Sequence, residues 1–161
     1  MARRVLGTVT VIAGQAGELR DVECVDGPAL EARFGSPTGM VMMSDGALIT
    51  ADEGNSRIRK LQNGVVTTLA GETYDEDDER LRDGPGATVR FFYPIGIALN
   101  TQGRLLVTDG SNHRIRRVTS EGETTTIGGA DGPEMEGVMG AIVVAKDGTA
   151  FVTELTQAHR I

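Results

Sequence analysis

Two pairs of polar residues with identical spacing are the first candidates for chemistry in this sequence. Asp52 precedes Asn55 by three residues, and Asp109 precedes Asn112 by three, each pair following a short apolar segment. Carboxylate and amide oxygens in this arrangement are suited to binding a cation. The same side chains often hydrogen-bond backbone N–H groups in turns. Because the pair recurs, we favour the structural role and predict no catalytic residue, no metal site and no cofactor.

A run of acidic residues is the second candidate site. Residues 72–83 carry seven carboxylates against Arg80 and Arg82. The run itself comprises Asp75, Glu76, Asp77, Asp78 and Glu79. A calcium loop would need alternating ligands, a glycine and a closing glutamate, a pattern that this segment lacks. Two interpretations stay open: a solvated acidic loop and a docking site for a protein ligand.

Arginines alternate along two segments, as Arg57 and Arg59 in one and Arg114 and Arg116 in the other. Such a stripe could bind phosphates, but it is more typical of a solvated strand edge. We therefore expect exposed arginines, with the two aspartates forming salt bridges to Arg57 and Arg114. Aromatic residues make up 4% of the chain and the formal net charge is −7. Both values argue against a nucleic-acid partner.

The histidines indicate no catalytic centre. His113 and His159 occupy equivalent positions in the chain, and placement by repetition is weak support for a metal centre. No spacing of Ser, His and acidic residues indicates a catalytic triad. We therefore predict that the chain is not an enzyme.

Composition limits the class of protein further. Of the 161 residues, 39% are hydrophobic and 24% are charged, as in a folded domain. No apolar run approaches the roughly 18 residues of a membrane span, so we predict no membrane partner. Residues 3–14 resemble a weak signal peptide, but they align with an internal repeat, so we reject that interpretation. The single cysteine, Cys24, excludes an internal disulfide and leaves the compartment open.

An internal repeat must position these side chains. Asp-Gly-Pro occurs at residues 26–28, 83–85 and 131–133, and Asp109 follows Asp52 by 57 residues. A shorter third copy contains Gly140, Gly148 and Glu154. Repeats of this length stack on one another, because one unit alone cannot bury its apolar face.

Each repeat predicts short strands separated by turn residues. A glycine after the first strand supplies the positive φ of a tight hairpin. The first two strands are apolar with little alternation, which indicates burial on both faces. Four strands per unit, buried inside and charged outside, predict an all-β fold made of β-propeller blades. The expected strands are 38–43, 47–51, 57–62 and 65–70; 95–100, 104–108, 114–119 and 123–128; and 141–145, 149–153, 160–161 continued by 3–6, and 8–13.

The repeated motif resembles the NHL repeat. The first copy has Pro37, Gly39, Asp52, Asn55, Arg57-Ile58-Arg59 and Gly71. The second has Pro94, Gly96, Asp109, Asn112, Arg114-Ile115-Arg116 and Gly129. The third departs from the motif, with Glu154 and Ala158 in place of the aspartate and asparagine. The resemblance implies blades of four antiparallel strands. Members of the family mostly form six-bladed propellers that bind protein or RNA, and some propeller lyases use metal-bound histidines near the channel.

We expect the chain to form half of such a propeller. Residues 26–71 and 83–129 are two predicted blades, and residues 1–14 complete the blade formed by 131–161, because 9–14 match 66–71. A homodimer would then close a six-bladed ring, so the main expected partner is a second copy. The strand pairing between subunits would use Arg3, Val5, Val9, Val11, Arg160 and Ile161.

The predicted function is a non-enzymatic binding or structural scaffold that assembles by completing blades between chains. A protein ligand at the long-loop face, residues 15–36 and 72–93, is a further expected partner. The alternative is a fragment of a propeller lyase or hydrolase whose site lies on that same face.

Overall fold

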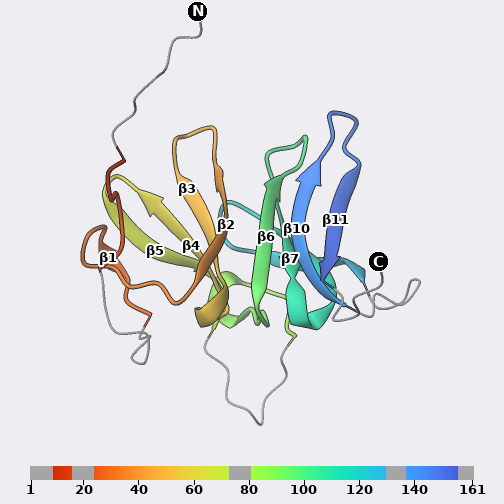
Figure 1. Cartoon of the computed structure of the whole chain (residues 1–161), viewed down its shortest axis with the longest axis horizontal. Coiled ribbons are helices and arrows are strands. Elements are labelled where there is room, and N and C mark those ends of the chain that lie inside the picture. The colour runs from red at the N-terminus through yellow and green to blue at the C-terminus, as the bar shows by residue number, and fades with distance from the viewer. Residues whose placement is uncertain (1–8, 16–23, 73–80, 130–136, 156–161) are drawn as a thin grey trace, which may run out of the picture.

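The computed structural model describes residues 9–15, 24–72, 81–129 and 137–155, and within them the chain is all-β (Figure 1). The strands form three antiparallel sheets with the orders β1-β5-β4-β3-β2, β6-β7-β8-β9 and β10-β11. We call them the first, second and third sheet. No helix in the described ranges is long and apolar enough to cross a membrane.

The strand bounds follow the apolar segments of the repeat. The first sheet comprises β1 (Gly27–Pro28), β2 (Pro37–Met42), β3 (Leu48–Asp52), β4 (Arg57–Gln62) and β5 (Val65–Ala70). The second comprises β6 (Pro94–Leu99), β7 (Leu105–Asp109), β8 (Arg114–Val118) and β9 (Thr124–Gly129). The third has β10 (Val138–Val144) and β11 (Ala150–Leu155). Short 3-10 turns are η1 (Glu53–Asn55), η2 (Gly86–Thr88) and η3 (Gly110–Asn112).

Tight hairpins join β2 to β3, β6 to β7 and β10 to β11. Gly46 and Gly103 have φ values of 85° and 73°, in the region that glycine reaches without steric cost. The N–H of Gly46 donates to the carbonyl of Met43, and the N–H of Met43 donates to the carbonyl of Ala47. The expected role of these glycines is confirmed.

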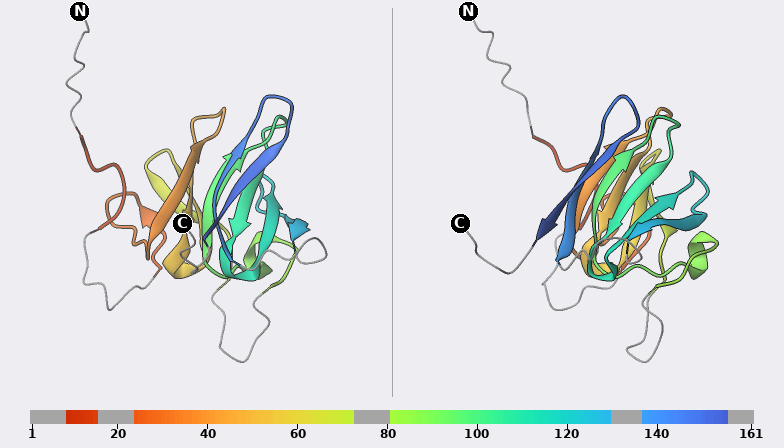
Figure 2. Two further views of the ribbon diagram at one scale, coloured as in Figure 1. Left: turned by 45° about the vertical axis from the view of Figure 1, so that its right-hand side comes forward. Right: turned by 90° about the vertical axis from the view of Figure 1, so that its right-hand side faces the viewer.

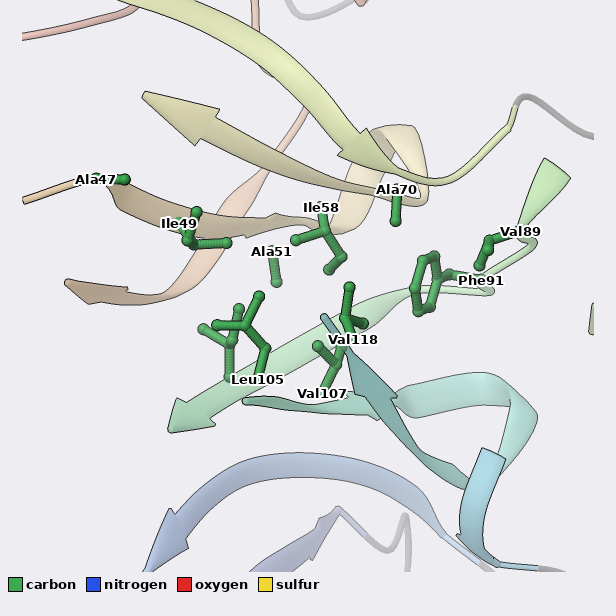
Figure 3. Close-up of a cluster of buried hydrophobic side chains, with 11 residues drawn as sticks. Ala47, Ile49, Ala51, Ile58, Ala70, Val89, Phe91, Leu105, Val107 and Val118 are labelled. Atoms are coloured by element: carbon green, nitrogen blue, oxygen red, sulfur yellow. The ribbon is translucent and has the colours of Figure 1, made fainter. Parts of the chain in front are cut away.

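The sheets stand side by side in a row, with the second between the other two (Figures 1 and 2). The first and second sheets bury one apolar cluster between them (Figure 3). The second and third bury a smaller cluster around Ala98, Leu106 and Ile142. Burial on both faces explains why β6 and β7 carry apolar residues with little alternation. The larger cluster consists of Ala47, Ile49, Ala51, Ile58, Ala70, Val89, Phe91, Ile97, Leu105, Val107 and Val118.

We call β2, β6 and β10 the inner strands, and neighbouring inner strands approach each other closely at two glycines. A Cβ atom on Gly39 would lie 2.6 Å from the carbonyl oxygen of Ile95, and one on Gly96 would lie 2.6 Å from that of Gly140. Any side chain at these positions would collide with the next sheet. The glycines of the Pro-x-Gly motif therefore set the spacing between sheets.

In the third sheet an alanine takes the position of the motif glycine. Ala141 occupies the position of Gly96, because its N–H donates to the Thr153 hydroxyl as that of Gly96 donates to Thr108. Gly140, which we expected at that position, lies one residue earlier. The expectation was wrong because the third copy lacks the proline that marks the strand start in the others.

Candidate functional site

The Asp52 side chain holds a turn together. Its Oδ1 atom accepts from the backbone N–H groups of Gly35 at 2.8 Å and Ser36 at 3.0 Å. Its Oδ2 atom accepts from Nδ2 of Asn55 at 2.8 Å and from Nη1 of Arg59 at 3.0 Å. The side chains of Asp52 and Arg59 are fully buried. Both carboxylate oxygens are therefore hydrogen-bonded within the fold, as expected for a buried charge.

Asp109 repeats this arrangement in the second sheet. Its Oδ1 atom accepts from the N–H of Phe92 at 2.7 Å. Its Oδ2 atom accepts from Nδ2 of Asn112 at 2.9 Å and from Nη1 of Arg116 at 2.5 Å. The side chains of Asp109 and Arg116 are also fully buried.

Two expectations about the arginines were wrong. The expected salt-bridge partners were Arg57 and Arg114, but the aspartates pair with Arg59 and Arg116. Arg57 lies opposite Asp52 in the β3–β4 ladder, and Arg59 is two residues further on the same face, within reach of a long side chain. Arg59 and Arg116 are also buried instead of solvated, because β4 and β8 are interior strands of their sheets.

Each buried arginine also binds a second carboxylate, which sequence reasoning missed. Nη2 of Arg59 donates to Oδ1 of Asp26 at 2.6 Å, and Nη2 of Arg116 donates to Oδ1 of Asp83 at 2.8 Å. We call Arg59 with Asp26 and Asp52 the first arginine clamp, and Arg116 with Asp83 and Asp109 the second. The signal was present in the sequence: the aspartates of the first two Asp-Gly-Pro motifs each precede the clamp arginine by 33 residues.

Further contacts bind each clamp to the loop before its sheet. The guanidinium of Arg116 donates to the carbonyls of Arg90 at 2.9 Å and Arg82 at 2.7 Å. Its carbon lies 5.0 Å from the centre of the Phe91 ring, a cation–π contact. Arg59 donates to the carbonyls of Arg33 and Val25, each at 2.9 Å, and stacks over Phe34 at 4.9 Å.

The two carboxylates of the second clamp differ in their pKa. Burial raises the pKa of Asp109, against the opposing charge of Arg116 and the hydrogen bonds from Asn112 and Phe92. Burial also acts to raise the pKa of Asp83, but hydrogen bonds from the Thr126 N–H and hydroxyl and from Arg116 outweigh it, so that pKa is lowered. Asp83 is half-exposed and Asp109 is fully buried, which accounts for the difference.

The inner strands of the three sheets line one shallow groove. Its wall comes from equivalent positions of β2, β6 and β10 and carries no ionisable side chain. The residues are Thr38, Gly39, Met40, Ile95, Gly96, Ile97, Ala141 and Ile142. Within the described residues, no three His, Cys, Asp or Glu side chains come together to hold a metal ion. This surface offers shape and apolar contact, not acid–base chemistry.

Two apolar sheet faces lie uncovered at the ends of the row. The first-sheet face consists of Met40, Met42, Leu48 and Leu61, and forms a groove with Ile12 and Phe34. The third-sheet face consists of Ala141, Val143 and Phe151. Val143 and Phe151 are 61% and 59% exposed and pair across β10 and β11. Exposed apolar patches of this kind mark interaction surfaces.

Several residues singled out in the sequence fall outside the described residues. They are the acidic run Asp75, Glu76, Asp77, Asp78 and Glu79, His159, and the expected pairing residues Arg3, Val5, Arg160 and Ile161. Val9 and Val11 are described, and both are exposed. Nδ1 of His113 lies 2.9 Å from the carbonyl oxygen of Gly137, where it links the second and third sheets.

The fold resembles solved structures that are much longer than this chain. One is a protein of unknown function from Bacteroides thetaiotaomicron, with a TM-score of 0.61, 18% identity, and coverage of 78% of this chain and 34% of that one. Another is a gluconolactonase from Xanthomonas campestris, with a TM-score of 0.57, 18% identity, and coverage of 74% and 35%. At these identities the likeness shows the fold alone.

A sequence relative covers part of the same region. Over 105 residues the chain is 31% identical to the chloroplastic protein SUPPRESSOR OF QUENCHING 1 of Arabidopsis thaliana. The match covers 63% of this chain and 10% of that protein. The chain thus spans about a tenth of this relative and about a third of the two similar structures.

The stacked antiparallel sheets define the class: the chain is built from β-propeller blades. Residues 34–61 and 91–118 match the NHL repeat. The chain therefore contains NHL repeats in a β-propeller fold, and the resemblance inferred from its sequence is confirmed.

Proposed function

We propose that this chain is a non-enzymatic β-propeller scaffold that assembles with a second copy into a closed ring of six blades. The observation that carries the proposal is the pair of exposed apolar faces on the first and third sheets, the two sheets at opposite ends of the row (Figure 1). Solvent penalises such faces, and covering them stabilises the assembly.

The internal interface supports a further blade as the occupant of the first-sheet face. Met40 is 59% exposed, whereas Ile97, its counterpart 57 residues later, is 6% exposed because the first sheet covers it. The remaining residues of the first-sheet face have buried or partly buried counterparts in the second sheet, namely Leu99, Leu105 and Val118. Because the first-sheet face carries matching apolar residues, it is suited to packing against another blade in the same way.

The backbone contacts of residues 9–15 are a second observation that supports a further blade beside the first sheet. The N–H groups of Gly14 and Gln15 donate to the carbonyls of Ala29 and Ala32, each at 2.8 Å. In the same way, 57 residues later, the N–H groups of Gly71 and Glu72, directly after β5, donate to the carbonyls of Gly86 and Val89. Residues 9–15 form no strand, but the contacts of Gly14 and Gln15 match those made directly after the outermost strand of a blade. A second copy would supply the strands of the further blade.

The groove along the inner strands favours a scaffold over an enzyme. Its wall has no ionisable residue, whereas hydrolytic chemistry requires positioned acids, bases or metal ligands. The four clamp carboxylates are engaged by arginines. The alternative, a fragment of a propeller lyase or hydrolase, is favoured by the fold shared with a gluconolactonase. That activity would need residues from the long-loop face.

Light scattering on the purified chain tests the proposal. We expect a mass of twice the 17.0 kDa of one chain, stable on dilution to micromolar concentration. A stable monomer would overturn the self-assembly, and a trimer would exclude the six-bladed ring. Lactone hydrolysis by the assembled protein would favour the alternative.

A further inference from the structure

We propose that the third-sheet face of one copy packs on the first-sheet face of the other, and that Ala141 limits the strength of this junction. The inference rests on the proposed self-assembly and identifies the surfaces that would carry it. Val143 and Phe151 are the inserting side chains, and Met40, Met42 and Leu48 receive them.

The inserting side chains are identified by their counterparts in the other sheets. Val41 and Ile49 form a cross-strand pair on the first sheet, which packs into the cluster shared with the second. Ala98 and Leu106 form the equivalent pair on the second sheet, in the cluster shared with the third. The third pair of this series is Val143 with Phe151, and it is exposed.

The receiving side chains are identified in the same way. Ile97 and Leu105 of the second sheet receive the first pair, and Ile142 with Val152 of the third sheet receive the second. The corresponding residues of the first sheet are Met40 and Leu48, and no sheet in the described part of the chain covers them. Methionine adapts its shape to an irregular partner, which suits an interface that takes the large ring of Phe151.

The relative orientation of the two copies follows from the assignment of the inserting and receiving faces. Each copy has one inserting face and one receiving face, at opposite ends of the row of sheets (Figure 2). Contacts of this kind are head-to-tail, and two of them close a two-fold ring if the rotation per copy is half a turn.

Ala141 distinguishes the proposed junction from the two internal interfaces. Gly39 and Gly96 are required where they lie, because a Cβ atom would be 2.6 Å from a carbonyl oxygen of the next sheet. Ala141 carries a methyl group at the equivalent position of β10, on the exposed face. At the junction this methyl would meet the backbone of β2 of the other copy. The two sheets must therefore separate locally, and the junction is weaker than the internal interfaces.

Two charge substitutions test which faces join. Phe151→Glu and Met40→Glu should each convert the dimer to a monomer in light scattering, because each buries a carboxylate at the junction without a partner. Ile127→Glu is the matched control: Ile127 is also an exposed apolar strand residue, but it lies on β9, outside both faces. The control should stay dimeric. Circular dichroism must show that all three variants remain folded.

Mixing the two monomeric variants tests the head-to-tail orientation. The Met40→Glu chain keeps an intact inserting face, and the Phe151→Glu chain keeps an intact receiving face. Their mixture should therefore form a one-to-one pair at concentrations where each alone is monomeric. A wild-type dimer that both substitutions leave intact would overturn the assigned faces but not the self-assembly. A monomeric wild-type chain would overturn both.

Ala141→Gly tests the limiting methyl group. This substitution should lower the dissociation constant of the dimer by about tenfold, because relieving an overpacked contact typically recovers free energy of this size. Ala150→Gly is the matched control, since Ala150 is an exposed strand alanine of the same sheet. It should leave the dissociation constant unchanged or raise it. An equal effect of both substitutions would refute the role of Ala141.

Discussion

The first and second sheets carry closely matching side chains, but their matching faces have different surroundings. Phe91, Ile97 and Leu105 are buried between the two sheets, whereas their counterparts Phe34, Met40 and Leu48 border an uncovered groove. The arginine clamps, in contrast, are the same in both sheets to within half an ångström in their ion pairs. The geometry of the arginine clamp is therefore determined within one repeat, whereas the burial of the apolar face depends on the neighbouring sheet.

Removal of the clamp arginine should have the largest effect on this comparison. Arg116→Ala leaves the buried carboxylate of Asp109 without its cation, and breaking a buried ion pair in this way costs about 3–5 kcal/mol of unfolding free energy. Arg59→Ala should cost less in the monomer, because Arg59 borders the open groove and water can reach Asp52 after the truncation. Denaturant unfolding of both variants measures the difference. Equal losses would mean that the neighbouring sheet does not influence the clamp.

Truncating one leucine in each sheet should have the next largest effect. Leu105→Ala removes a fully buried side chain and should lower the free energy of unfolding by about 2–5 kcal/mol. Leu48→Ala, at the matching but only partly buried position, should cost less, about 1 kcal/mol, in a monomeric background such as Phe151→Glu. In the dimer the difference between the two losses of unfolding free energy should be smaller. A difference that does not depend on the oligomeric state would contradict the proposed cover of Leu48.

The smallest expected effect is that of low pH on the stability contributed by Asp83, the half-exposed carboxylate of the second clamp. The folded state lowers the pKa of Asp83 below its ordinary value of 3.8, so its stabilising contribution is complete above that value. The contribution is lost as the pH falls from 3.8 through the lower folded pKa. Asp83→Asn should therefore be less stable than the wild type at pH 7, with the difference in melting temperature shrinking toward pH 3. A constant difference would exclude this linkage.

Asp109 follows the opposite sign, because its pKa is raised by burial. Any stability linked to its protonation is present below pH 3.8 and is lost as the pH rises through the folded pKa. The two carboxylates of one arginine therefore respond to acid in opposite directions.

Local patterns made much of the fold predictable from the sequence. The hairpin glycines Gly46 and Gly103 and the apolar strands beside them depend on residues close in the chain, and the structure has them as expected. The position of the arginines was harder to predict. Alternation along β4 is the same for an edge strand and for an interior strand whose arginines reach buried carboxylates, so Arg59 was wrongly expected to be solvated.

The candidate site was less predictable, because it depends on packing between repeats. The hydrogen bond to Thr153 puts Ala141 at the position of Gly96. The offset that relates Gly148 to Gly103 and Glu154 to Asp109 predicts the same position, but without a preceding proline Gly140 was wrongly expected to be the motif glycine. The exposure of Met40 is likewise set by the absence of a covering sheet in the described part of the chain and not by the identity of the residue.

The first arginine clamp has a consequence for how the chain is made. The partners of Arg59 are Val25, Asp26, Arg33, Phe34 and Asp52, and Asp26 also accepts from the N–H of Thr68. All of them belong to one repeat, and none comes from the second sheet. The clamp can therefore close as soon as residue 68 has left the ribosome. The contacts of the clamp therefore need no residue of the second sheet, whereas the apolar face of the first sheet is buried only after the second sheet packs on it.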